Sequence, residues 1–266
     1  TLGAVFNALG FTGSLDYYNI KITDTIFGPD VNDIIATCYG YNDINPLSAT
    51  SAASPYCGAI NRSNNNLSFL ALPAALGGDA SGYFQAINQG SVKTSGVDFQ
   101  LGYRLPTEFI SETSALNFNL AVSYLIDFVN TSNLGGLGSL SNDYAGTASY
   151  FGAGLGTSFP KWKGNLNIGL NFDENLSLNT RIRYIDGMTN RAAEQYVGET
   201  FSGPGSVWYF DFALQAEVEA FTFRIGLNNA FDKEPPTYAP NVQSGTDPSL
   251  YDVIGRRAYA SVRLRF

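Results

Sequence analysis

Histidine is absent from this sequence, and charged side chains are scarce. The lack of His in 266 residues excludes Ser-His-Asp and Cys-His catalysis and His-based metal sites. Charged residues make up 14% of the chain, against about 25% in a typical soluble domain. The sequence therefore predicts no enzyme, no metal site and no cofactor, and a surface that faces something other than water.

Long hydrophobic runs are also missing. No stretch approaches the roughly 20 apolar residues that a membrane-spanning helix needs. The mean hydropathy is close to zero, at -0.05. These two facts exclude a helical membrane protein, but they allow a transmembrane β-barrel, whose strands alternate lipid-facing and lumen-facing residues.

The chain carries little positive charge. Its net charge is -8 and its sequence pI is about 4.5. An acidic surface repels phosphates, so no nucleic-acid partner is expected. The sequence begins at Thr1 without a signal peptide, which predicts either a mature exported chain or a piece of a longer one.

The only two cysteines, Cys38 and Cys57, lie in a segment rich in Asn, Ser, Ala and Pro. We expect a disulfide across an exposed loop, which fits an oxidising, extracytoplasmic setting. The alternative is a pair of free thiols.

Aromatic residues are abundant, at 14% of the chain, and they fall in segments with two-residue alternation. In residues 207–219, for example, Trp208, Phe212 and Leu214 alternate with polar side chains. The pattern predicts about eight antiparallel strands of the length that a tilted membrane strand needs. They cover residues 11–23, 91–105, 116–128, 162–172, 176–184, 207–219, 221–231 and 256–266.

The connections between these strands alternate between long and short. The long ones are residues 24–90, 130–161, 185–206 and 232–255. Outer-membrane barrels have long extracellular loops and short periplasmic turns. The alternation therefore predicts an all-β transmembrane antiparallel barrel with a periplasmic C-terminus, and it assigns the four long connections as extracellular loops. Aromatic residues near the strand ends, such as Trp162, Tyr184 and Trp208, are expected to form the interfacial girdles.

Several segments resemble one family. The last residues, 256–266, alternate and end in Phe266, like the final strand of outer-membrane barrels. Residues 227–236 (LNNAFDKEPP) resemble the "NLFDK" stretch near the end of TonB-dependent receptors, with Ala230 where Leu is commoner. Residues 251–257 (YDVIGRR) resemble the sequence that leads into their last strand. Residues 14–22 and 94–99 match upstream parts in the same order.

This resemblance implies the C-terminal part of a plugged barrel of roughly 22 strands. No part of the chain resembles the plug, so the plug is not expected in residues 1–266. The resemblance further implies TonB-dependent uptake, in a Gram-negative outer membrane, of a scarce or bulky nutrient such as a ferric siderophore, cobalamin or oligosaccharide. The implied partners are outer-membrane lipid and lipopolysaccharide, the rest of the barrel and its plug, TonB through that plug, and the small-molecule nutrient.

Polar and aromatic side chains in the predicted loops are candidates for nutrient binding, because such groups hold polar ligands by stacking and hydrogen bonding. Solvated loop surface is the alternative for each of them. The candidates are Tyr39, Tyr41, Asn42, Asp43, Asn61, Arg62, Asn142, Asp143, Tyr144, Asn190, Arg191 and Tyr238.

Three other classes of protein compete with a receptor. A complete eight-stranded barrel with a structural or adhesive role is possible in size, although the small polar residues of the lumen face would fill its interior poorly. A passive porin would lack a plug. An outer-membrane enzyme would need more than carboxylate pairs such as Glu217 and Glu219, which have no nucleophile or His beside them.

Overall fold

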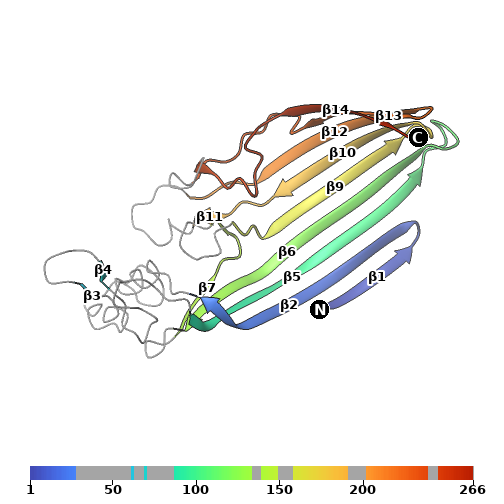
Figure 1. Ribbon diagram of the computed structural model, residues 1–266. Coiled ribbons are helices and arrows are strands. Elements are labelled where there is room, and N and C mark those ends of the chain that lie inside the picture. Colours follow the sequence, from blue (N-terminus) through green and yellow to red (C-terminus); the bar gives the residue numbers. More distant parts are fainter. Residues whose placement is uncertain are drawn as a thin grey trace.

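The computed structural model describes residues 1–27, 61–62, 69–70, 87–133, 139–148, 158–190, 202–238 and 245–265. In these ranges the fold is all-β, with one large antiparallel sheet (Figure 1). The fold class expected from the sequence is thereby confirmed. Within the same ranges, no helix is both long and apolar enough to cross a membrane.

Nine strands follow one another across the sheet, each hydrogen-bonded to the next. They are β1 (Leu2–Ala8), β2 (Phe11–Phe27), β5 (Ile87–Pro106), β6 (Ala115–Asn133), β9 (Trp162–Asn171), β10 (Leu176–Ile185), β12 (Val207–Val218), β13 (Phe221–Asn228) and β14 (Arg257–Leu264). A further strand, β7 (Ser139–Asp143), pairs with the end of β6. Two small pairs complete the described strands: β3 (Asn61–Arg62) with β4 (Phe69–Leu70), and β8 (Thr147–Ala148) with β11 (Thr189–Asn190).

The register gathers the alternating apolar residues on one face, here called the apolar face. Leu178 lies opposite Leu214, and Leu214 lies opposite Ile225. The opposite face, here called the polar face, carries Asn, Arg, Gln and Ser, as where Gln215 lies opposite Arg224. Because directly paired residues share a face, the facing predicted from alternation holds across β9, β10 and β12 to β14.

Aromatic rings border the apolar face at both ends. Near the long-loop end, Tyr124 packs against Trp162 with ring centroids 4.3 Å apart, and Tyr184 packs against Trp208 at 4.5 Å. Near the short-turn end, Phe11 stacks on Tyr103 at 4.2 Å. From Trp208 to Val218 the strand covers about 33 Å at about 3.3 Å per residue, or about 25 Å along the membrane normal at a tilt of about 40°. That height matches the apolar band of an outer-membrane barrel.

One predicted facing is wrong. The sequence pattern places Ile126 and Phe128 on the apolar face and Asp127 on the polar face. A bulge in β6 shifts the register, so Ser95 pairs with Asp127 while Gly96 pairs with Leu125. Asp127 therefore shares the face of Tyr124, and Phe128 points to the other side. An extra residue in one strand reverses the alternation beyond it.

Three strands extend far past their predicted ends. β2, β5 and β6 have 17, 20 and 19 residues, because polar residues such as Thr131 and Ser132 continue the ladder where apolar alternation has stopped. At the other end, the turns are tight. Leu9 and Gly10 both have positive φ, and the Asp173 carboxylate accepts hydrogen bonds from the backbone N–H groups of Asn175 and Leu176, both at 2.7 Å.

β1 is an additional strand that the sequence reading left unassigned. It pairs with β2 from Leu2 to Ala8 and has no second neighbour among the described residues. β14, at the opposite end of the order, likewise has β13 as its single partner there. The described sheet is therefore open, and Figure 1 shows it as a curved wall with β1 and β14 at its two edges.

Candidate functional site

A small buried core joins the bases of the long connections at one end of the sheet. Its members, here called the loop-base core, come from three connections and from the ends of β10 and β12. They are Ala148, Ile185, Met188, Val207, Tyr209, Tyr238 and Tyr251. Tyr209 is completely buried, although it lies in β12 on the polar face, because the chain before β14 folds over it.

An ion cluster lies next to this core on the polar face. The Arg183 guanidinium donates to Asp211 through Nε and Nη2, at 3.0 and 3.1 Å. It also donates to Asp252, with Nη2 2.6 Å from Oδ2. The guanidinium lies over the Tyr209 ring, 4.7 Å from its centroid, and the Tyr209 hydroxyl accepts the backbone N–H of Asp252 at 3.2 Å. Arg183 thus joins β10, β12 and the segment before β14.

The two segments quoted for the family resemblance meet at this cluster. Asn229, with φ of 48°, donates its backbone N–H to Asp211 at 2.8 Å. Its side-chain amide pairs with both backbone groups of Lys233, at 2.8 and 2.9 Å. Asp232, also at positive φ, accepts the backbone N–H of Arg256 at 2.8 Å. Asn and Asp tolerate the left-handed conformation, so the segment after β13 folds back and holds the segment that leads into β14.

A second hydrogen-bonded group fixes the loop above Tyr209. The Asp247 carboxylate accepts the backbone N–H of Ser158 at 3.1 Å and the hydroxyl of Ser249 at 2.6 Å. Ser158 and Tyr238 share a hydroxyl–hydroxyl hydrogen bond of 3.0 Å. Connections that are far apart in sequence are therefore tied together by their own polar groups.

Burial and hydrogen bonding shift the pKa of these loop groups. Burial raises the pKa of the Tyr238 and Tyr251 hydroxyls above the ordinary tyrosine value. Burial alone would also raise the pKa of Asp247, but hydrogen bonds from Ser249 and Ser158 outweigh it and lower that pKa. The carboxylate is therefore ionised at neutral pH and holds its donors tightly.

The structure places some of the predicted binding residues inside the loop bases. Tyr144, Asn190 and Tyr238 are 3%, 5% and 3% exposed. Asp143 caps the hairpin at the end of β6, where its Oδ1 accepts the N–H groups of Phe128 and Ala145, each at 3.0 Å. Asn142 lies in β7 opposite Asn130. Tyr144, Asn190 and Tyr238 therefore pack within the loop bases, whereas Asp143 stays exposed.

The other predicted residues are not brought to this cluster. Asn61 and Arg62 form β3. The remaining candidates lie outside the described residues, as does the expected Cys38–Cys57 disulfide. These candidates are Tyr39, Tyr41, Asn42, Asp43 and Arg191.

The cluster positions the loop bases through ion pairs and hydrogen bonds among its own side chains. No group of three or more His, Cys, Asp or Glu side chains in the described part of the chain could hold a metal ion. Two-residue alternation in the sequence is enough to put Arg183 and Asp211 on the polar face, but it does not indicate their contacts with Tyr209, Asn229 and Asp252. The family-like segments 227–236 and 251–257 were the available signal, because both supply members of the cluster.

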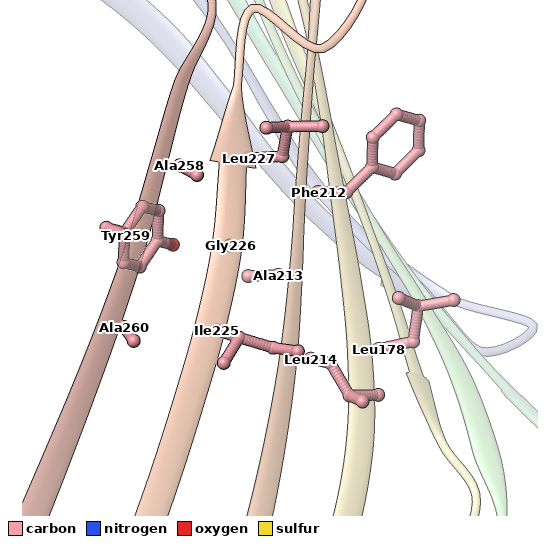
Figure 2. Close-up of a pocket in the computed structure, with 10 residues that line it drawn as sticks. All are labelled: Leu178, Phe212, Ala213, Leu214, Ile225, Gly226, Leu227, Ala258, Tyr259 and Ala260. Atoms are coloured by element: carbon pink, nitrogen blue, oxygen red, sulfur yellow. The ribbon is translucent and has the colours of Figure 1, made fainter.

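A separate apolar groove of about 620 Å³ opens mainly on the apolar face of the last strands (Figure 2). It is lined by Leu178, Phe212, Ala213, Leu214, Ile225, Gly226, Leu227, Ala258, Tyr259 and Ala260. It lies between the aromatic borders, at a height where apolar side chains contact lipid. The groove is therefore part of the wall and not a site for a polar nutrient.

Comparisons with known proteins agree with this architecture. The family of TonB dependent receptor-like β-barrels matches residues 1–230. The FrpB iron transporter from Neisseria meningitidis is similar at 12% identity and a TM-score of 0.50, over 98% of this chain and 30% of that one. A ferric enterobactin receptor (PfeA) mutant from Pseudomonas aeruginosa is similar at 13% identity and a TM-score of 0.52, over 98% of this chain and 30% of that one. The siderophore receptor PirA from Acinetobacter baumannii is similar at 12% identity and a TM-score of 0.53, over 99% of this chain and 31% of that one.

No curated protein matches the chain significantly. The chain spans about three tenths of the length of the solved structures it resembles, as the coverage of 30% of the FrpB chain shows. At this identity those structures share the fold, and the family match carries the assignment. With 1–230 of its 266 residues matched, the chain belongs to the TonB-dependent receptors and forms part of their outer-membrane β-barrel.

Proposed function

We propose that this chain is the C-terminal part of the barrel of a TonB-dependent transporter that takes up a ferric siderophore across the outer membrane. The observation that carries the proposal is an open nine-strand wall in a chain that belongs to the TonB-dependent receptors. The remaining strands and the plug then belong to the rest of the same receptor. The substrate class follows from the relatives, which are named an iron transporter, a ferric enterobactin receptor and a siderophore receptor.

In this proposal the long-loop end is extracellular and the C-terminus is periplasmic. The loops above the loop-base core form part of the ligand vestibule, where Asp143 and the candidate residues of the first loop meet the nutrient. The plug carries the contact to TonB. Cobalamin and oligosaccharides are the other nutrient classes that such a mouth could take.

The test is an uptake assay with the complete receptor in an outer-membrane host that lacks its own siderophore receptors. We expect uptake of iron-55 supplied as ferric enterobactin, and loss of that uptake when TonB is deleted. Cobalamin and maltooligosaccharides serve as competing substrates. Uptake that persists without TonB would identify a passive porin, and uptake of only cobalamin or sugar would overturn the substrate class.

A small closed structural or adhesive barrel is the main alternative. It would need β1 and β14 to pair, whereas neither is the other's neighbour among the described strands. The open edges and the family match therefore both favour the receptor.

A further inference from the structure

Two lysines face each other on the apolar face, just beyond its aromatic border. Lys21 of β2 lies directly opposite Lys93 of β5, and no bulge separates this pair from Tyr17 opposite Val97. Alternation therefore puts both lysines on the face of Tyr17. Directly opposed side chains have Cβ atoms about 4.5–5.5 Å apart, and like charges at that spacing repel. The pairing is therefore unfavourable by itself, and an anion near the two ammonium groups would relieve the repulsion.

Among the described residues, a carboxylate neutralises one of the two ammonium groups. Lys93 Nζ lies 2.8 Å from Asp127 Oδ2, in an ion pair that the β6 bulge makes possible. The next carboxylate, Asp143, is already held by two backbone N–H groups. Lys21 has no ion pair within the described part of the chain. Among the described residues, the Lys21 ammonium group therefore has no paired carboxylate, while Lys93 has Asp127.

The height of the pair matches the headgroup layer. Lys21 follows Tyr17 by four residues, which is about 13 Å along the strand and about 10 Å along the membrane normal. The polar layer outside the hydrocarbon is about 5–8 Å thick on each side, and a lysine side chain reaches back toward it along its apolar stem. Asn19 and Ser95 lie between these levels, and the Asn19 amide donates to the Tyr17 hydroxyl at 3.3 Å.

We propose that Lys21 and Lys93 together bind a phosphate group of an outer-leaflet lipid against the outer wall of β2 and β5. A phosphate carries enough negative charge to satisfy Lys21 while Lys93 keeps Asp127, and its oxygens accept from several ammonium hydrogens. The lipid's acyl chains then lie along the apolar face below the aromatic border. This inference rests on the outer-membrane placement of the barrel and is independent of which nutrient is transported.

The test is native mass spectrometry of the complete detergent-extracted receptor, with diphosphoryl lipid A, its dephosphorylated form and inorganic phosphate as probes. We expect retention of diphosphoryl lipid A well above that of the dephosphorylated form. Each lysine near a charged lipid surface contributes about fivefold in affinity, so Lys21→Gln should lose about fivefold and the Lys21→Gln/Lys93→Gln double variant about thirtyfold. Lys163→Gln is the matched control, because Lys163 lies on the polar face opposite Ser123.

Unchanged retention in both variants, or equal retention of the dephosphorylated lipid, would overturn the proposal. So would displacement of the lipid by inorganic phosphate, because the site would then serve a free anion. Heat-modified mobility in SDS gels reports whether each variant forms a barrel. If the double variant fails to fold, Lys21→Gln decides alone, since it leaves the Lys93–Asp127 pair in place. Lipid retention and nutrient uptake are separate measurements, so failure of one proposal is distinguishable from failure of the other.

Discussion

Arg183 holds two carboxylates that would otherwise repel each other. Its side chain is 20% exposed, and those of Asp211 and Asp252 are 15% and 19% exposed. Removing one partner from a buried ion cluster leaves the others unpaired, which costs about 3–5 kcal/mol when burial is complete. The residual exposure here places the expected cost toward the lower end of that range.

Arg183→Met should therefore release the segment before β14 and lower the stability of the loop bases by about 3 kcal/mol. The measurement is limited proteolysis of the folded receptor, followed at the connection between β13 and β14. Arg224→Met is the matched control, because Arg224 lies on the polar face of β13 opposite Gln215 and Ser261 and outside the Arg183 cluster. Equal cleavage of the two variants would contradict the role given to the Arg183 cluster.

Leu214 and Gln215 are adjacent residues of β12 whose side chains lie on opposite faces of the sheet. Leu214 lies between Leu178 and Ile225 on the apolar face, and Gln215 lies opposite Arg224 on the polar face. Leu214→Arg should destabilise the folded barrel by about 2–4 kcal/mol, as expected for a charge near the bilayer midplane. Gln215→Arg should be much milder. Urea unfolding in liposomes measures both, and equal effects would show that the faces are wrongly assigned.

Gly226 has no room for a side chain. An added Cβ would collide with the ring of Tyr259, which lies across the glycine on the neighbouring strand. Gly226→Val should cost about 1–3 kcal/mol, because overpacking forces the ring or the strand to move. Gly164→Val is the control, since a Cβ at Gly164 meets nothing closer than 3.8 Å. A shift in the heat-modification temperature for Gly226→Val alone is the expected result.

At the scale of elements, the segment around Asp247 should respond to acid. The pKa of Asp247 is lowered in the folded loop, so its stabilising effect is present above the ordinary value of 3.8 and is lost as pH falls from there through the lower folded value. The hydrogen-exchange protection of residues 245–251, relative to the intrinsic exchange rate at each pH, should therefore fall below about pH 3.8. In Asp247→Asn that additional acid response should be missing. An identical acid response in the variant would assign the effect to another group.

The apolar face was predictable because lipid exposure and two-residue alternation impose the same pattern on every strand. Phe128 shows where that rule fails, since one bulged residue in β6 reverses the facing beyond it. The extensions of β2, β5 and β6 could not be predicted from alternation either, because both of their faces carry polar residues. The sequence pattern did not predict β1, because the first of the eight predicted strands begins at residue 11. In the structure, Leu2 to Ala8 pair with β2 along their whole length.

The ion cluster beside the loop-base core was beyond prediction for a different reason. Arg183, Asp211 and Asp252 are separated by 28 and 69 positions along the chain, measured from Arg183. Only the folded sheet brings them together. Tyr238 and Tyr144 could be named from composition as candidate ligand contacts, but composition does not distinguish an exposed loop tyrosine from one that packs beneath the loop.

At the scale of the whole molecule, the two edges of the sheet show whether the described strands close a barrel by themselves. β1 and β14 each have a single partner within the described ranges, and unpaired strand edges do not persist in lipid. In the proposed receptor, further strands therefore pair with β1 and β14 and close the barrel, and the family resemblance implies a plug inside it.

The most direct test is a structure of the complete membrane-extracted particle that contains this chain, with the strands counted around the barrel. The account predicts about 22 strands, with a separate globular plug inside and with β1 and β14 each paired to a strand from outside residues 1–266. A closed barrel in which β1 pairs directly with β14 and no plug is present would contradict it.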